Sequence, residues 1–165
     1  MRTIQTIDYV SPIGIIEISG TEEGVCSILF TDREESIPHE QEEKCPQPLR
    51  VCRQQLEEYF AGTRQDFTVP MWMDGTGFQK TVWNTLTTIP YAQKITYTQL
   101  AALIGKENAV RAVGNANGKN RLNIIVPCHR LIGANGSLTG YSGGLWRKEW
   151  LQNHERSHQW SPKQK

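Results

Sequence analysis

The chain has 165 residues, of which 38% are hydrophobic and 21% are charged, and its formal net charge is +1. These values are typical of a globular protein with a buried core, arranged as one domain or as two small ones. No stretch approaches about 18 apolar residues and the first residues lack the apolar core of a secretory signal, which argues against a membrane span and predicts a cytoplasmic protein with free thiols.

The charge is divided unevenly along the chain. Residues 1–73 contain 6 Lys and Arg against 13 Asp and Glu, whereas residues 74–165 contain 12 against 4. A basic half beside an acidic half favours a polyanionic partner for the basic half, with nucleic acid as the main candidate. The alternative is an incidental imbalance of surface charge.

The first 73 residues are predicted to form a small unit of strands and one helix. β-forming residues occupy 2–10, 14–18 and 25–30, and the short turns between them favour antiparallel pairing. A polar loop over 32–47 precedes a helix over 48–61, whose apolar residues should cover the sheet. Residues 66–73 indicate a strand or extended linker, and the turn sequence over 74–77 marks the boundary between units 1–73 and 74–165.

The second unit is predicted to be mainly helical. Thr76 can cap a helix that runs to Thr88, and Thr96 with Gln99 offers a capping box for the next helix. Asn108 can open a further helix over 109–117, and two helices joined by a short turn are typical of a helix-turn-helix. Its small residues permit either close approach to DNA or tight packing on another helix, and the basic flanks favour DNA. A last helix is expected over 145–154.

A cysteine follows an apolar run near residue 125. The run Ile124-Ile125-Val126 predicts a short buried strand that ends at Pro127. Cys128 and His129 follow directly after the end of this strand. A thiol is nucleophilic as thiolate, and imidazole or cationic neighbours lower its pKa. The residue types alone leave open a second interpretation, a structural buried cysteine next to a surface histidine.

Several motifs of the second unit together resemble one known family. IVPCHR is followed by LTGYSGG (residues 138–144) and KEWLQNHE (residues 148–155), and it is preceded by ITYTQLAALIG and AVRAVGNANGKN. This series resembles the methylated-DNA–protein-cysteine methyltransferases over about half of the chain. The resemblance implies an α+β fold, with a ribonuclease H-like antiparallel sheet and helix before a winged helix-turn-helix. It also implies a single-turnover repair protein that takes the alkyl group of O6-alkylguanine irreversibly onto its own cysteine, with O4-alkylthymine as a further candidate substrate.

The resemblance further implies the roles of individual residues. Cys128 would accept the alkyl group, and His129, oriented by Glu155, would draw off its proton. Asn120 would brace the cysteine segment, and Tyr97 would donate a proton to a ring nitrogen of the departing guanine. The base pocket would be formed by Tyr141, Ser142, Leu131 and Pro127.

Relatives flip the damaged nucleotide out of the duplex and contact the minor groove with the second helix of the helix-turn-helix. Arg111 would fill the vacated space, and the expected DNA-contacting set is Arg111, Ala112, Gly114, Asn115 and Arg130. The implied partner is double-stranded DNA with an alkylated guanine, bound by a monomer. The sequence contains no metal or cofactor motif, so neither a metal nor a cofactor is expected.

Two departures and three alternatives accompany this interpretation. Arg121 follows Asn120 where relatives commonly have proline, and Leu131 replaces their usual valine. The chain could instead be a non-catalytic binder of alkylated DNA, but such proteins have tryptophan where this chain has Cys128. A thiol hydrolase is a further alternative without a matching signature. A loosely spaced zinc site remains conceivable from Cys26, His39, Cys45 and Cys52.

Overall fold

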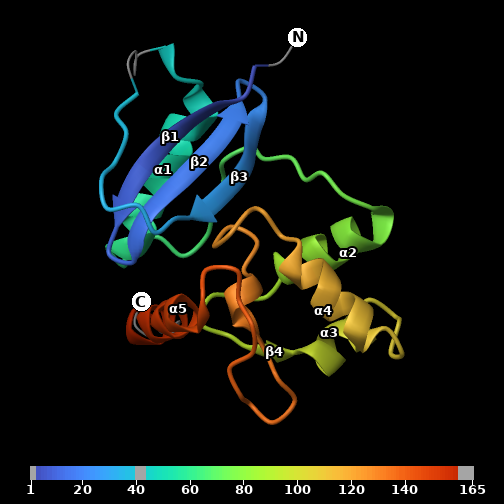
Figure 1. The fold of residues 1–165 in the computed structure, drawn as a ribbon. Helices are drawn as coiled ribbons and strands as arrows, with labels where there is room; N and C mark the ends of the chain where they lie inside the picture. Colours follow the sequence, from blue (N-terminus) through green and yellow to red (C-terminus); the bar gives the residue numbers. More distant parts are fainter. Residues whose placement is uncertain (1–2, 40–43, 160–165) are drawn as a thin grey trace, which may run out of the picture.

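The computed structural model describes residues 3–39 and 44–159, which form an antiparallel sheet with one helix, followed by a mainly helical part (Figure 1). The α+β class predicted from the sequence is confirmed. No helix among the described residues is both long enough and apolar enough to cross a membrane.

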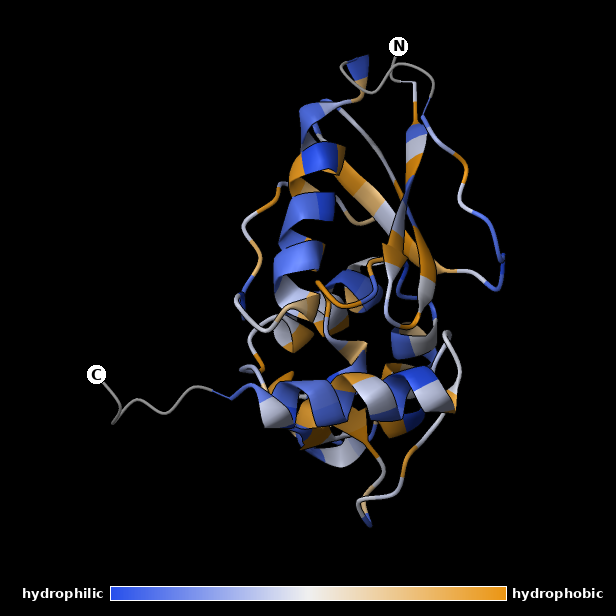
Figure 2. Ribbon diagram, turned by 90° about the vertical axis from the view of Figure 1, so that its left-hand side faces the viewer, coloured by the Kyte–Doolittle hydropathy of each residue, from blue (hydrophilic) through white to orange (hydrophobic). Residues whose placement is uncertain are grey.

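The sheet consists of β1 (Gln5–Ser11), β2 (Gly14–Thr21) and β3 (Gly24–Phe30), in that order and antiparallel. Helix α1 (Gln47–Phe60) lies across these strands with its apolar side inward (Figure 1). Figure 2 shows that the outer side of α1 is hydrophilic, whereas the strands it covers are largely hydrophobic. The predicted strands and helix are therefore present, although Arg2 and residues 40–43 lie outside the described residues.

The linker between the two parts runs along the edge of the sheet. Val25 N donates to Pro70 O over 2.9 Å, and Trp72 N donates to Val25 O over 3.0 Å. Gly24 has φ +153, and a Cβ there would lie 2.9 Å from Pro70 O, so the close approach of the linker requires glycine. The expected extended linker is thus held to β3 by backbone hydrogen bonds.

The second part packs three helices together and adds two short strands and a final helix. Capping boxes of Thr76 with Gln79 and of Thr96 with Gln99 start the first two helices. The prediction that Asn108 caps the third helix is wrong, because this helix has Ala109 at its N-cap position and no side-chain cap. The elements are α2 (Gly77–Leu86), β4 (Ile95–Thr96), α3 (Tyr97–Leu103), α4 (Val110–Gly118), the 3-10 helix η2 (Cys128–Arg130), β5 (Leu131–Ile132) and α5 (Leu145–Ser157).

Candidate active site around Cys128

The segment before Cys128 is buried, but it is not the predicted strand. Ile125 N donates to Asn123 O over 2.8 Å, and Val126 N donates to Leu122 O over 2.9 Å, so the backbone is satisfied by local turns. Ile124 has φ +73, a conformation incompatible with a strand. The β-branched side chains of this segment fill the core, and Cys128 follows as the first residue of η2.

This turn is fixed to the edge strand of the sheet. Ile28 N donates to Arg121 O over 2.7 Å, and the Asn123 side-chain amide donates to Ile28 O over 2.9 Å. These bonds join residues more than 90 positions apart, so β3 of the first part forms the rigid support of the cysteine segment.

The Cys128 thiol is 3% exposed and sits among amide groups. Asn120 Nδ2 lies 3.2 Å from Sγ and 3.2 Å from Val126 O, while Asn120 Oδ1 accepts from Leu122 N over 2.9 Å. Sγ also lies 3.8 Å from Asn123 Oδ1. Asn120 therefore contacts both the sulfur and the turn that carries it, as its predicted bracing role requires.

Burial raises the pKa of Cys128 to about 11, against the opposing influence of Asn120 and the positive charge of Lys148. The sequence led us to expect that neighbouring groups lower this pKa, whereas in this site the shift is in the opposite direction. Desolvation in the closed site outweighs the neighbouring positive groups, and the sulfur is protonated near neutral pH. Formation of the thiolate then requires a base close to the site.

His129 is suited to be that base. Its Nε2 lies 2.6 Å from Glu155 Oε2, and a carboxylate can only accept, so Nε2 carries the proton. Nδ1 is buried and has no hydrogen-bond partner among the described residues, which leaves its lone pair available. Burial lowers the pKa of His129 against the attraction of Glu155, so the ring is held neutral.

Glu155, on α5, is the centre of a buried hydrogen-bond network. Besides His129, it accepts from Arg130 at both oxygens over 2.9 and 3.0 Å, from Ala92 N over 3.1 Å and from the Tyr59 hydroxyl over 2.7 Å. Burial alone would raise the pKa of Glu155, but the hydrogen bond from His129 and the hydrogen bonds and charge of Arg130 hold it well below its usual range. Glu155 thus remains ionised and orients the imidazole.

Arg130 does not have the surface position that a DNA contact requires. It is 7% exposed, and its remaining terminal nitrogen donates to Ile89 O over 2.7 Å in addition to the bonds with Glu155. The prediction of a DNA contact is wrong because this guanidinium is already bonded inside the protein. Its sequence position next to His129 gave no indication of that internal pairing.

A second polar group involves Tyr97, on α3. The Tyr97 hydroxyl lies 2.8 Å from Thr139 Oγ1, and Lys148 Nζ donates to the same oxygen over 3.0 Å and to Thr139 O over 3.2 Å. Burial lowers the pKa of Lys148 to about 8. Sequence reasoning missed Lys148, although its spacing to Leu151 and Glu155 puts all three on one side of a helix.

The predicted base-pocket residues lie in different environments. Ser142 is exposed and donates from Oγ to Asn123 Oδ1 over 3.3 Å. The Tyr141 hydroxyl is buried next to the Cys128 thiol, and burial together with the nearby sulfur raises the pKa of Tyr141 well above its usual range. Pro127 is buried beside the cysteine. Leu131 is fully buried in the β4–β5 pair, so a part for it in the base pocket stays a prediction.

Helix α4 presents small and basic residues outward. Arg111, Ala112 and Asn115 are exposed, whereas Val113 faces the core. Gly114 is half-buried, and a Cβ there would lie 3.6 Å from the Tyr97 ring. The predicted DNA-contacting set on α4 therefore borders the polar group around Tyr97.

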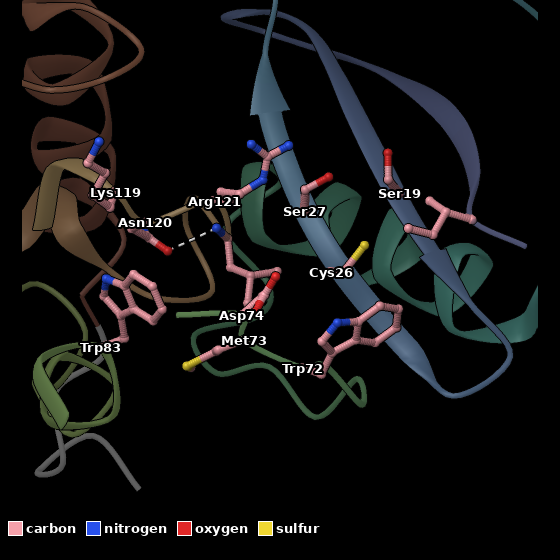
Figure 3. Close-up of a pocket in the computed structure, with 12 residues that line it drawn as sticks. Ser19, Cys26, Ser27, Trp72, Met73, Asp74, Trp83, Lys119, Asn120 and Arg121 are labelled. Carbon is pink, nitrogen blue, oxygen red and sulfur yellow. Dashed lines mark hydrogen bonds between the residues drawn. The ribbon is translucent and has the colours of Figure 1, made fainter. Parts of the chain in front are cut away.

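A separate cavity of about 310 Å³ lies between β3 and the end of α4 (Figure 3). Cys26 and Ser27 line one side, and Lys119, Asn120 and Arg121 line the other, whereas Cys128 is not among its lining residues. Among the described residues no three His, Cys, Asp or Glu side chains are grouped to hold a metal, so the zinc alternative from Cys26, His39, Cys45 and Cys52 finds no support in the structure.

The fold and site together define a helix-turn-helix protein in which a buried cysteine lies beside a histidine–glutamate pair. Residues 7–72 match the ribonuclease-like domain of the 6-O-methylguanine DNA methyltransferases, and residues 77–157 match their DNA binding domain. The chain therefore belongs to the methylated-DNA–protein-cysteine methyltransferase family.

Individual relatives agree with this assignment. The methylated-DNA–protein-cysteine methyltransferase of Methanosarcina acetivorans is 47% identical over 151 residues, which are 90% of this chain and 96% of the relative. The constitutive enzyme of Bacillus subtilis is 41% identical over 152 residues, 88% and 92% of the two chains. The crystal structure of Mycobacterium tuberculosis O6-methylguanine methyltransferase has a TM-score of 0.84 and 37% identity over 96% of both chains. A DNA complex of the M. tuberculosis protein has a TM-score of 0.81 and 40% identity, covering 94% of this chain and 93% of that one.

Proposed function

We propose that this chain repairs DNA by moving the alkyl group of O6-alkylguanine onto the sulfur of its own Cys128. The observation that carries the proposal is the arrangement of His129, whose Nε2 is bonded to Glu155 while Nδ1 has no partner among the described residues. A buried thiol with such a base beside it can become a nucleophile during the reaction without being ionised at rest.

The reaction is a single displacement at carbon. The new bond forms between Cys128 Sγ and the alkyl carbon as the bond from that carbon to O6 breaks. The thiol proton passes to His129 Nδ1, through a water molecule, and Tyr97 donates a proton to a ring nitrogen so that guanine leaves neutral. Return of the histidine proton to the phenolate restores both side chains, so the net change is exchange of the thiol proton for the alkyl group.

Ser142 would hold O6 and Tyr141 would form one wall of the base pocket. Since Ser142 Oγ is bonded to Asn123 in the structure, binding of the base would exchange that contact for one to O6. Pro127 adjoins the reacting sulfur in sequence and supports the same pocket.

The alkylated base is inaccessible inside a stacked duplex, so it must be rotated out before transfer. We assign DNA contact to the minor groove and to the exposed side of α4, with Arg111 occupying the space the base leaves. The exposure of Arg111, Ala112 and Asn115 and the half-burial of Gly114 support this role, because small side chains fit a narrow groove.

The unit of function in this proposal is one chain with two parts that meet near residues 73 and 74. The thiol, its base and α4 all belong to one copy, so the chemistry requires no partner subunit. We therefore expect a monomer, and sedimentation with and without DNA measures the oligomeric state. We place the protein in the cytoplasm, since its four cysteines are free thiols and the acceptor must stay reduced.

The direct test is methyl mapping after incubation with a duplex that contains O6-methylguanine. The methyl group should appear on the peptide with Cys128, and Cys128→Ser should acquire none. A non-catalytic binder of alkylated DNA would bind this duplex and gain no mass. Label on Cys26, Cys45 or Cys52 instead would overturn the assignment of the acceptor.

A further inference from the structure

The first part of the chain contributes a side chain to the buried network behind Cys128. Tyr59, near the end of α1, is fully buried, and its hydroxyl donates to Glu155 Oε2 over 2.7 Å. The same oxygen accepts from His129 Nε2 over 2.6 Å. A residue that packs against the sheet is thus one hydrogen bond away from the group that orients the proposed base.

We propose that Tyr59 is a positioning residue for alkyl transfer, acting through Glu155 on His129; this inference rests on the function proposed above. The Tyr59 hydroxyl and the imidazole share one carboxylate oxygen, so each limits the negative charge available to the other. The phenol also fixes the carboxylate, because its ring is held by contacts with Phe60, Phe67 and Tyr91 at centroid distances of 5.3 to 6.1 Å.

Several other charged or titratable groups face this network and can also change the pKa of His129. A test must therefore separate the effect of Tyr59 from theirs. Arg130 from η2 and Lys148 from α5 both act on His129, and His154 Nε2 from α5 donates to Tyr59 O over 2.7 Å. The titratable or charged groups around His129 and Glu155 include Tyr59, Tyr91, Arg130, Tyr141, Lys148 and His154. Among the tyrosines of this set, only the Tyr59 hydroxyl has a hydrogen bond to Glu155 within the described structure.

The informative variant is Tyr59→Phe, which keeps the ring and removes the donor. Without that donor, Glu155 Oε2 attracts a proton on His129 more strongly, so His129 should bind its second proton at higher pH. The acid limb of the pH–rate profile for methyl transfer should therefore move upward by about half to one unit, which is a roughly threefold to tenfold loss of rate on that limb. The plateau rate at higher pH should stay within about twofold.

Tyr91→Phe is the matched control. The Tyr91 hydroxyl is buried near the same network, and its ring lies 5.7 Å from the Arg130 guanidinium, but it has no hydrogen-bond partner among the described residues. Its removal should leave the profile unmoved. In a Glu155→Gln background, Tyr59→Phe should cause no further shift, because the path to His129 has been removed.

The rate is measured with free O6-methylguanine and with methylated duplex, alongside the melting temperature of each variant. An unmoved profile for Tyr59→Phe, or a loss equal at every pH, would overturn the inference and leave the transfer reaction standing. The inference would also be overturned if Tyr59→Phe still moved the acid limb in the Glu155→Gln background. Absence of transfer by the wild-type protein would instead overturn the proposed function itself.

Discussion

Replacement of Glu155 by glutamine should damage both stability and alkyl transfer. The carboxylate accepts five hydrogen bonds, three at Oε2 and two at Oε1. A glutamine amide nitrogen in either position faces donors and cannot accept from them, and Arg130 loses its buried counter-charge. Breaking a buried ion pair costs about 3–5 kcal/mol, a large part of the roughly 5–15 kcal/mol that stabilises a typical domain.

The pH dependence of this effect follows from the low pKa of Glu155 in the folded protein. Because that pKa lies below its unfolded value of about 4.3, the stabilisation is fully present above about pH 4.3 and is lost as the pH falls through the folded value. Urea unfolding should therefore separate wild type from Glu155→Gln widely at pH 7, and the part of the difference that Glu155 contributes should shrink at pH 3.

Transfer from free O6-methylguanine should slow by roughly 10²- to 10⁴-fold in Glu155→Gln, because a positioned general base contributes about that much. Affinity for undamaged duplex should change little, since Glu155 is buried. Single-turnover mass spectrometry measures the rate, and urea titration measures the stability. A variant with the wild-type rate and with stability within about 1 kcal/mol at pH 7 would refute the role given to this carboxylate.

Three further expectations concern the DNA surface and the resting thiol. Arg111→Ala should slow repair of duplex far more than reaction with the free base, which needs no extrusion; equal losses would remove Arg111 from that role. The association constant for undamaged duplex should fall by roughly 0.9 log units for each tenfold rise in salt concentration and each phosphate contacted. If Lys119 contacts a phosphate, Lys119→Gln should make this salt dependence less steep. A salt-independent affinity would contradict a phosphate-contacting surface. Iodoacetamide at pH 8 should label Cys128 more slowly than an unfolded-chain thiol, because burial raises the pKa of Cys128 to about 11; faster labelling would contradict the protonated resting state.

Local signals in the sequence predicted local structure well. Thr76 and Thr96 start helices where their capping boxes lie, because both halves of each box are within four residues. Asn108 failed as a cap because an N-cap residue type does not fix where packing lets the helix begin. The run Ile124-Ile125-Val126 failed as a strand because apolar β-branched residues suit any buried segment, and φ at Ile124 is not visible in the residue types.

The candidate site divides in the same way. The resemblance named Cys128, His129 and Glu155, and the structure brings the latter two within 2.6 Å. Tyr59 lies 96 residues before Glu155 in the chain, so no local pattern indicates their contact. The internal pairing of Arg130 is likewise a product of tertiary structure, whereas the helical spacing of Lys148 and Glu155 could have been used. The raised pKa of Cys128 depends on burial, which the neighbouring residue types do not predict.

The central claim is that Cys128 is the acceptor and is consumed. An S-alkyl thioether has no good leaving group, so the alkyl group should stay on the sulfur once it has been transferred. The most direct measurement is intact mass spectrometry with a large excess of duplex containing O6-methylguanine, combined with counting of the guanines repaired. We predict one methyl group per protein molecule, one guanine repaired per molecule, and no reaction with Cys128→Ser. Repair of many guanines by each molecule, or full methylation of Cys128→Ser, would contradict the account.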